Sequence, residues 1–559
     1  MDAPASPPAP RPESLIAGVF TLAAALVGLS GRLPDDEGVL TFIGATVVAR
    51  EPLAGLFFQK IHPATSALYA PFAALGWRPF VVAHAVAAGL AIHLLGGVAR
   101  RVGRGPPWLP ALILATSPLY LLSAATGQSN STAILFFVGA LALLDGSPRA
   151  QALAGVVAAA GLWSRYEQAP YLLALVAFDG LHRRRPYATA GFAGAVTLYL
   201  LAGALYHRDA LWIVARPPVM PREVGPSTMG ALGLTRADLA SLLTGFFLLT
   251  PAAFVPLLLR PRAAAPLLRG LAATLALAFA AQLALPQLGR LFNYDYTARY
   301  FLCHLPALAL LIGEVAADTA PSGRRAFALG ALALGAGFAL HEVSRPYAAA
   351  AAALLALPWI VHTPRGRVVS LAVAACAGLV AAPLVGERHT AAPLLPGLAV
   401  AAAEVERAPR GSVVYTNAHQ LQRLLDARGS GRRVRFLVGH DMVNELATEL
   451  GGRQSAQSAA VFRALEPVLY GEVLWPCAFP HTAPAGSLLV LAMPERAAWV
   501  YDLRAWTEAS NRVRASGVVA VWRARAAVTI PRAAPPPWMS PAAFALPCAE
   551  RRAPPGAPP

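Results

Sequence analysis

The chain has 559 residues, of which 56% are hydrophobic and only 13% are charged, and its formal net charge is +17. Soluble domains carry about 25% charged residues. The composition therefore excludes an ordinary soluble protein and predicts a chain that crosses a membrane many times. The net charge does not indicate nucleic-acid binding, because the arginines form short clusters between apolar segments and no single basic face or tail.

The apolar segments predict a polytopic α-helical membrane protein with about thirteen transmembrane helices in residues 15–385. Residues 1–14 are expected to form a disordered cytoplasmic N-terminus. The predicted spans cover 15–29, 79–98, 108–125, 131–144, 156–163, 170–181, 188–205, 239–259, 271–285, 300–317, 326–340, 348–361 and 368–385.

Arginine clusters occur on alternate connections between these spans. The positive-inside rule makes those connections cytoplasmic. The first outer loop, residues 31–78, and everything after residue 385 are then expected outside. An odd number of spans with the N-terminus inside leads to the same topology.

Residues 386–530 differ in character from the apolar region. Short β-type runs alternate with helical patterns, which predicts a small extracytoplasmic α/β domain. The expected strands are 412–415, 434–438, 487–492 and 517–522, and the expected helices are 419–427, 442–450 and 459–469. Residues 531–559 are Pro-rich and are expected to be a disordered tail.

Three consecutive acids, Asp35, Asp36 and Glu37, follow the first predicted span. Acids at this position suit a helix N-terminus, where they meet free N–H groups and the positive end of the helix dipole. Adjacent carboxylates near a membrane surface also suit a general base for an acceptor hydroxyl. A third alternative is that the three acids hold a divalent cation.

Lys60 is the only lysine in the chain and begins the segment Lys60-Ile61-His62-Pro63. A lone lysine beside an apolar run is commonly an interface anchor. A lysine ammonium facing a lipid-linked phosphate would also stabilise an anionic leaving group. These two interpretations are compatible.

Two further outer connections carry candidate phosphate ligands. Arg165 lies in a turn with Glu167, where it either binds phosphate or forms a local ion pair. The loop 287–299 carries Arg290 and Arg299, which are suited to clamp a phosphate, and Tyr296, which is typical of an interfacial aromatic belt.

The order of five short segments resembles the GT-C membrane glycosyltransferases, most closely the aminoarabinose-transferase and protein O-mannosyltransferase-like branch. In chain order they resemble that family's DE motif, KPP-type stretch, SP-hydrophobic turn, G-L-x-x-x-R/K segment and RY-x-x-x-x-x-P segment. The segments are Asp36–Gly38, Lys60–Pro63 (with His62 replacing the first proline), Ser117–Tyr120, Gly161–Arg165 and Arg299–Pro306.

The resemblance implies an inverting glycosyltransferase of the bacterial inner membrane. It would move a sugar from a polyprenyl-phosphate donor, which enters from the bilayer, to a hydroxyl of a lipid, glycan or protein on the outer face. Asp36 would be the base, with Asp35 and Glu37 in support or on a metal ion. The residues expected to bind the donor phosphate are Lys60, Arg299 and Arg165, and those expected in substrate-binding loops are His62, Asn130, Tyr296 and Arg290.

Asn130 stands where that family often has an acid. An asparagine neither acts as a base nor supplies charge to a metal. Either the three acids work alone or the protein has diverged from catalysis, as a scaffold of envelope assembly. A transporter or lipid flippase is the other alternative, although such proteins place ionisable residues near the bilayer midplane and often contain internal repeats.

Overall fold

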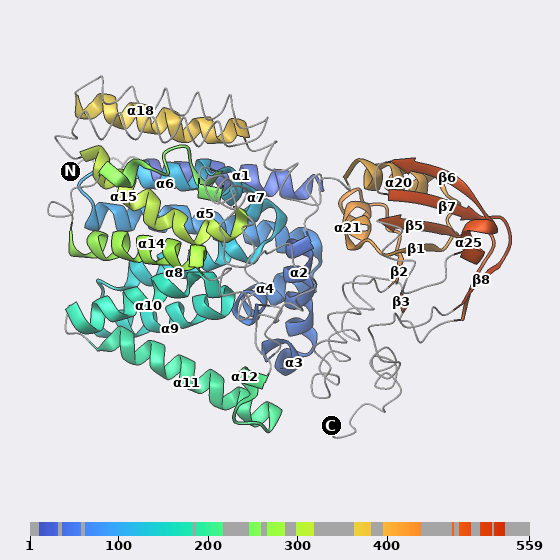
Figure 1. Cartoon of the computed structure of the whole chain (residues 1–559), viewed down its shortest axis with the longest axis horizontal. Coiled ribbons are helices and arrows are strands. Elements are labelled where there is room, and N and C mark those ends of the chain that lie inside the picture. The colour runs from blue at the N-terminus through green and yellow to red at the C-terminus, as the bar shows by residue number, and fades with distance from the viewer. Residues whose placement is uncertain are drawn as a thin grey trace, which may run out of the picture. The chain divides into compact units, whose positions relative to one another are not determined.

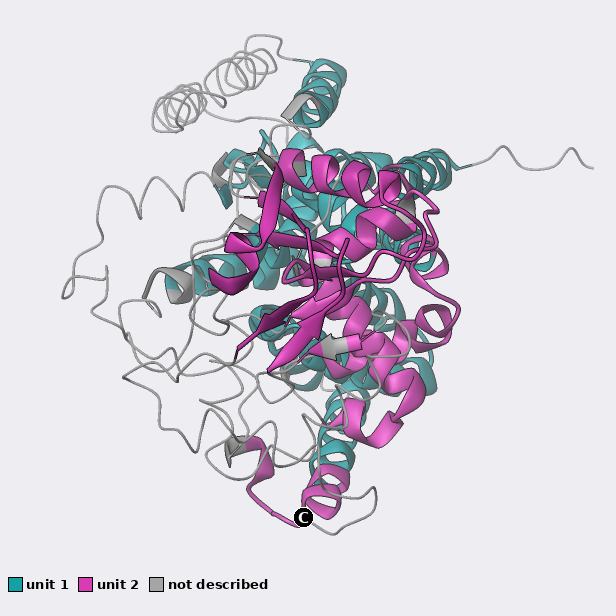
Figure 2. Cartoon of the chain, turned by 90° about the vertical axis from the view of Figure 1, so that its right-hand side faces the viewer, with its two compact units in different colours: residues 1–26, 83–201, 221–389 teal, residues 27–82, 202–220, 390–559 magenta. Residues whose placement is uncertain are grey.

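The structure is a computed structural model, and it divides the chain into two compact units. Unit 1 comprises residues 1–26, 83–201 and 221–389, and unit 2 comprises 27–82, 202–220 and 390–559 (Figure 2). The structure describes residues 11–31, 36–57, 62–182, 186–215, 245–246, 248–258, 265–284, 298–317, 363–381, 395–437, 472–474, 480–492, 504–516 and 519–531.

Among the described residues of unit 1, all the regular secondary structure is helical. In Figure 1 the helices α8, α9 and α10 pack as neighbours, and α14 contacts both α10 and α15. The elements that begin or lie in this unit are α1 (Pro12–Leu29), α6 (Trp108–Thr116), α7 (Pro118–Thr126), α8 (Ser129–Leu143), α9 (Pro148–Ser164), η2 (Tyr166–Gln168), α10 (Ala169–Ala177), η3 (Phe178–His182), α11 (Tyr187–His207), η4 (Val255–Leu258), α14 (Pro266–Ala284), η5 (Ala298–His304), α15 (Leu305–Ala317), α18 (Pro364–Ala377) and η6 (Gly378–Ala381).

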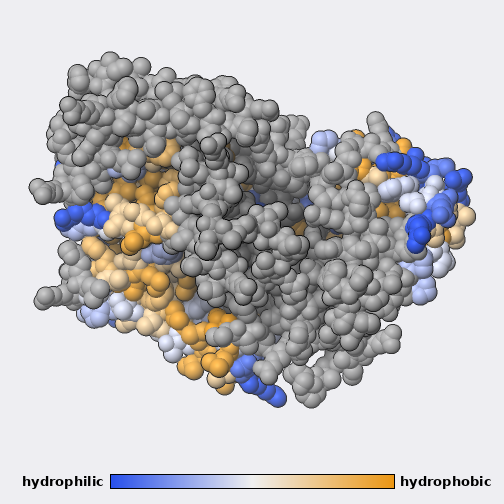
Figure 3. Space-filling view, in the orientation of Figure 1, coloured by the Kyte–Doolittle hydropathy of each residue, from blue (hydrophilic) through white to orange (hydrophobic). Residues whose placement is uncertain are grey.

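Four helical segments in the described residues are long and apolar enough to cross a membrane, and the bent pair α6–α7 would make a fifth. Figure 3 shows hydrophobic residues gathered on the visible surface of the helical region. Leu198, Leu201 and Leu205 on α11 are 58–81% exposed. Large apolar side chains exposed along a helix fit a lipid-facing surface.

Several helices of unit 1 begin at a Ser-Pro or Thr-Pro pair. The Ser117, Ser147 and Thr363 side chains each accept a bond from a backbone N–H of the first helical turn, and proline follows each of them. This is the preferred chemistry of a helix start, because proline lacks the N–H that would otherwise be unsatisfied. Pro118 therefore breaks the third predicted span, and α6 and α7 meet at 67°.

Unit 2 combines three helices from the first predicted outer loop with the C-terminal region. The loop contributes α2 (Asp36–Arg50), α3 (Pro52–Leu56) and α4 (Pro63–Ala74). The start of α5 (Trp77–Val102), the end of α11 and α12 (Trp212–Ala215) also lie in this unit. Helices α2 and α4 contact each other extensively.

The C-terminal region is an α/β domain with a six-stranded sheet in the order β3-β2-β1-β5-β7-β6. Strands β1, β2, β3 and β5 pair in parallel, and β7 pairs antiparallel with β5 and β6. A second sheet pairs β4 with β8. The strands and helices are α20 (Leu395–Arg407), β1 (Val414–Thr416), α21 (His419–Ala427), β2 (Arg435–Leu437), β3 (Glu472–Leu474), β4 (His481–Ala483), β5 (Leu488–Ala492), α25 (Arg504–Glu508), β6 (Ser510–Ser516), β7 (Val519–Ala524) and β8 (Val528–Ile530).

Many of the expected elements appear, while others lie outside the described residues. The expected helix 419–427 matches α21 at both ends, and the spans expected at 15–29, 79–98 and 188–205 match α1, α5 and α11 within a few residues. The spans at 326–340 and 348–361 and the helices at 442–450 and 459–469 are not among the described residues. The total of thirteen spans and the outward orientation of the α/β domain therefore stay predictions.

His481 is expected to make the stability of the α/β domain depend on pH. Its Nε2 lies 3.0 Å from the Tyr415 hydroxyl. Burial lowers the pKa of His481, Arg435 lowers it further, and Glu472 opposes the shift. The folded state thus favours the neutral ring, whereas the unfolded chain takes up a proton near pH 6.5.

The stability of the strands around His481 is therefore expected to fall as the pH is lowered through about 6.5. Hydrogen exchange of peptides covering β1 and β4, corrected for intrinsic rates, should show weaker protection at about pH 5.5 than at about pH 7.5. His481→Gln should remove most of this difference. Equal protection of the wild type at both pH values would contradict the assignment.

Candidate functional site

The acidic segment forms the start of helix α2. Asp36 is its first residue, and Glu37 is buried with 6% of its surface exposed. The Thr41 hydroxyl donates to the Glu37 carbonyl and fixes the first turn. Acids in a first turn face the positive end of the helix dipole, so this position supports the helix-start interpretation. The general-base and cation-binding alternatives stay open. Asp35 and the side chain of Asp36 lie outside the described residues.

A cluster of aromatic side chains holds the end of α3, three residues before Lys60. The Phe57 ring stacks on Tyr206 with centroids 5.2 Å apart and meets Trp212 edge-on at 5.9 Å. The His207 ring lies 5.0 Å from Trp212, and its Nε2 is 3.3 Å from the Phe57 carbonyl oxygen. We call Phe57, Tyr206, His207 and Trp212 the aromatic clamp. It fixes the chain entering the Lys60 segment, although Lys60 itself is outside the described residues.

His62 has a left-handed backbone conformation, with φ 53° and ψ 73°, directly before Pro63 at the start of α4. This region is uncommon for residues other than glycine, and a following proline further restricts the residue before it. Such strain persists only where the surroundings enforce it, and it is concentrated at functional sites. His62, predicted to lie in a substrate-binding loop, is thus at a constrained turn.

The Asn130 side chain joins two arginines in unit 1. Its Oδ1 accepts a 2.5 Å hydrogen bond from Arg165 Nε, and its Nδ2 donates a 2.7 Å bond to the Arg299 carbonyl. Asn130 lies in the first turn of α8, Arg165 ends α9, and Arg299 lies in η5. The structure thus brings together three of the residues predicted from the sequence.

Tyr300 lies beside both guanidinium groups. The Arg165 Cζ atom is 5.7 Å and the Arg299 Cζ atom 5.4 Å from its ring centroid, within the range of cation–π attraction. Glu167 Oε1 is 3.5 Å from an Arg165 nitrogen. Arg165 thus pairs with Glu167 and also lies beside the Tyr300 ring, as Arg299 does. The ion-pair and phosphate-binding interpretations of Arg165 are therefore compatible.

This polar network has the chemistry of an anion site. Arg165 is only 8% exposed, and a guanidinium carries five N–H donors in a plane that matches the oxygens of a phosphate. The Asn130 amide accepts from Arg165 and donates to the Arg299 carbonyl. An ionised carboxylate would accept from Arg165 but could not donate to the carbonyl. The amide thus has a definite role in orienting Arg165.

Neither the residues of the aromatic clamp nor Tyr300 is predicted from the sequence as a site residue. Tyr300 directly follows the predicted site residue Arg299, and this adjacency is the sequence feature that could have indicated Tyr300 as a site residue. Phe57 and Trp212 are far apart in the chain, and their sequence carries no sign that they meet. Tyr296 and Arg290 lie outside the described residues.

Within the described part of the chain, no group of three or more His, Cys, Asp or Glu residues could hold a metal ion. Asp35 and the side chain of Asp36 are not among the described residues. Metal binding by the acidic segment stays a prediction.

Gly203 tests the role of the aromatic clamp. A Cβ atom at this position would overlap the Trp212 ring, whereas one at Gly194 on the same helix would meet no described atom within 4 Å. Gly203→Ala should lower the unfolding free energy by about 1–3 kcal/mol, because it displaces Trp212 from the clamp.

Gly194→Ala is the control and should be neutral or stabilising, since alanine favours a helix. Thermal unfolding in detergent gives both values. An equal effect of the two substitutions would show that the clamp does not confine Trp212.

The Asn130–Arg165 hydrogen bond is expected to be strong because it is charge-assisted and buried. A double-mutant cycle of Asn130→Ala and Arg165→Ala should give a coupling free energy of about 1.5–3 kcal/mol. The cycle of Arg165→Ala with Glu167→Ala should give less, since that pair is longer. Chemical denaturation in detergent supplies both cycles, and a larger coupling to Glu167 would reverse the assignment.

Two solved structures resemble this chain over about nine-tenths of its length. No protein-family model and no curated protein matches the sequence. The crystal structure of ArnT from Cupriavidus metallidurans bound to undecaprenyl phosphate matches with a TM-score of 0.53 and 16% identity, over 91% of this chain and 97% of that chain. The apo structure of the same protein matches with a TM-score of 0.55 and 18% identity, over 90% and 97%. The predicted GT-C resemblance is therefore confirmed: the chain has the fold of that membrane glycosyltransferase.

Proposed function

We propose that this protein is a membrane glycosyltransferase that uses a sugar donor linked to a polyprenyl phosphate. The arginine network Asn130–Arg165–Arg299 is the observation that carries the proposal. Two guanidinium groups beside Tyr300, in a helical unit with lipid-facing surfaces, suit an anionic head group attached to an apolar chain. The shared fold supports this, since that ArnT structure is bound to undecaprenyl phosphate.

In the proposed reaction the acceptor hydroxyl oxygen attacks the anomeric carbon of the sugar, and the bond from that carbon to the phosphate oxygen breaks. Asp36 takes the hydroxyl proton, and the bonding electron pair leaves on the polyprenyl phosphate. Arg165, Arg299 and Lys60 stabilise the negative charge of this leaving group. Attack opposite the leaving group inverts the anomeric centre.

The supporting residues have narrower roles in this proposal. Asp35 and Glu37 support Asp36, or they hold a divalent cation. His62, Arg290 and Tyr296 belong to loops that contact substrate. We place the protein in the bacterial inner membrane, with the N-terminus cytoplasmic and the α/β domain outside, and with a hydroxyl of a lipid, glycan or protein as the acceptor.

A transporter of a lipid-linked substrate is the second candidate. Buried ionisable residues within apolar helices favour it, since such residues often mark transport pathways. Glu314 and His304 are both at most 1% exposed. However, Arg104 Nε lies 2.5 Å from Glu314, and Tyr171 lies 2.6 Å from His304, so both buried groups have local structural partners. Substrate flux across proteoliposomes without any glycosidic product would favour the transporter.

Asp36→Asn tests the proposed base. It should lower the release of undecaprenyl phosphate from undecaprenyl-phosphate-linked sugars by about 10²–10⁴-fold, the usual contribution of a general base. The assay uses membranes with equal amounts of each variant. Glu51→Gln, just beyond the other end of α2, is the matched control and should retain activity. Transfer by Asp36→Asn at the wild-type rate would refute the assignment.

A further inference from the structure

The Arg423 side chain connects the α/β domain to the helix that carries the acidic segment. Arg423 lies on α21, and its Cζ atom is 4.1 Å from the ring centroid of Phe42 on α2. The same atom is 4.4 Å from the ring of Trp77, at the start of α5. All three residues belong to unit 2.

Arg423 is buried in this contact, with 4% of its surface exposed, and Phe42 is 1% exposed. Both distances are well inside the roughly 6 Å limit of cation–π attraction, which is stronger for a desolvated cation. The planar guanidinium also suits aromatic faces, whereas a lysine ammonium is a compact point charge. The contact therefore favours arginine over lysine.

The aromatic side of this contact is well fixed. Phe42 meets Trp77 edge-on at 5.4 Å and Phe80 at 5.1 Å. Phe80 in turn meets Tyr69 on α4 at 5.7 Å. Helices α2, α4 and α5 thus share one aromatic cluster, and Arg423 is the charged group on its surface.

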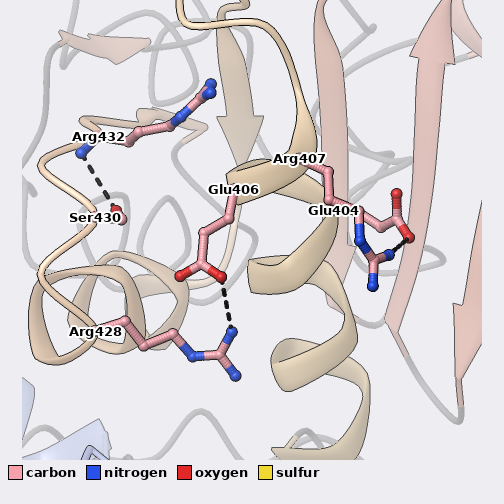
Figure 4. A network of polar contacts seen from close by, with 6 residues as sticks. All are labelled: Glu404, Glu406, Arg407, Arg428, Ser430 and Arg432. Carbon is pink, nitrogen blue, oxygen red and sulfur yellow. Dashed lines mark hydrogen bonds and ion pairs between the residues drawn. The ribbon is translucent and has the colours of Figure 1, made fainter.

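The helix that carries Arg423 is also fixed. Next to it, the Gln422 side chain donates to Asp426 and to the Arg432 carbonyl and accepts from the Val434 N–H. Five residues on, Arg428 pairs with Glu406 at 3.2 Å, which ties α21 to α20 (Figure 4). Arg423 is therefore held by the α/β domain, so it can restrain α2.

Phe42 lies six residues after Asp36 on the same helix. At 1.5 Å per residue this is about 9 Å along the axis, and Thr41 and Thr46 bond back to carbonyls one turn earlier. A rotation or shift of α2 at Phe42 is therefore transmitted to Asp36 and Glu37. Misplacement of a reacting group by about 1 Å is enough to reduce a rate about 100-fold.

We propose that Arg423 is a positioning residue: by stacking on Phe42 and Trp77 it makes the α/β domain set the orientation of the acidic start of α2. This inference rests on the proposed function only for its kinetic consequence. The structural consequence, that α2 depends on Arg423, is independent of any reaction.

Arg423→Met removes the charge and keeps much of the side-chain volume, and Arg423→Lys keeps the charge without the planar group. Arg410→Ala, at an exposed arginine of the same domain that plays no part in this contact, is the control. Arg423→Met should lower kcat for undecaprenyl phosphate release by about 10- to 100-fold, with KM for the undecaprenyl-phosphate-linked sugar changed less than about twofold. Arg423→Lys should restore part of kcat, and Arg410→Ala should retain the wild-type kcat.

Hydrogen exchange of the peptide covering the first turns of α2 gives a second measurement. Exchange should be faster in Arg423→Met than in the wild type and unchanged in Arg410→Ala. Unchanged exchange and unchanged kcat in Arg423→Met would overturn the inference, as would equal loss in Arg410→Ala. If the wild type itself releases no undecaprenyl phosphate, the proposed function fails, and the exchange comparison alone decides the role of Arg423.

Discussion

The side chain of Asn130 joins three segments that lie far apart in the chain: the start of α8, the end of α9 and the short helix η5. Polar groups among apolar helices are costly unless they are hydrogen-bonded. The Asn130 amide satisfies two such groups at once, because it accepts from the Arg165 guanidinium and donates to the Arg299 backbone carbonyl. The arrangement of Arg165, Arg299 and Tyr300 depends on that bridge, and so does the proposed recognition of a lipid phosphate.

Arginine performs several different physical tasks in this protein. Arg165 is bonded to an amide, Arg423 is stacked on aromatic rings, and Arg104 is paired with the buried Glu314. A guanidinium suits all of these because it combines a flat face with five donors and stays charged. The near-absence of lysine from the sequence is thus consistent with contacts that an ammonium would make poorly.

The sequence was informative about elements and less so about their contacts. Long apolar runs predicted α1, α5 and α11, and the amphipathic pattern of residues 419–427 predicted α21, because each signal is local. Asn130 was interpreted as the loss of an acid, since a sequence shows the residue type without its partners. The aromatic clamp and the Arg423 contact were not predicted, because both join residues that are distant in the chain through packing alone.

Unit 2 is assembled from the beginning, the middle and the end of the chain. During synthesis α2 is made early, whereas α21, which carries Arg423, is made after all of unit 1. Closing so long a loop is entropically costly and comes late in folding. A nascent chain therefore holds its acidic helix without the Arg423 contact until the last domain has folded, so the proposed active geometry arises only in the finished protein.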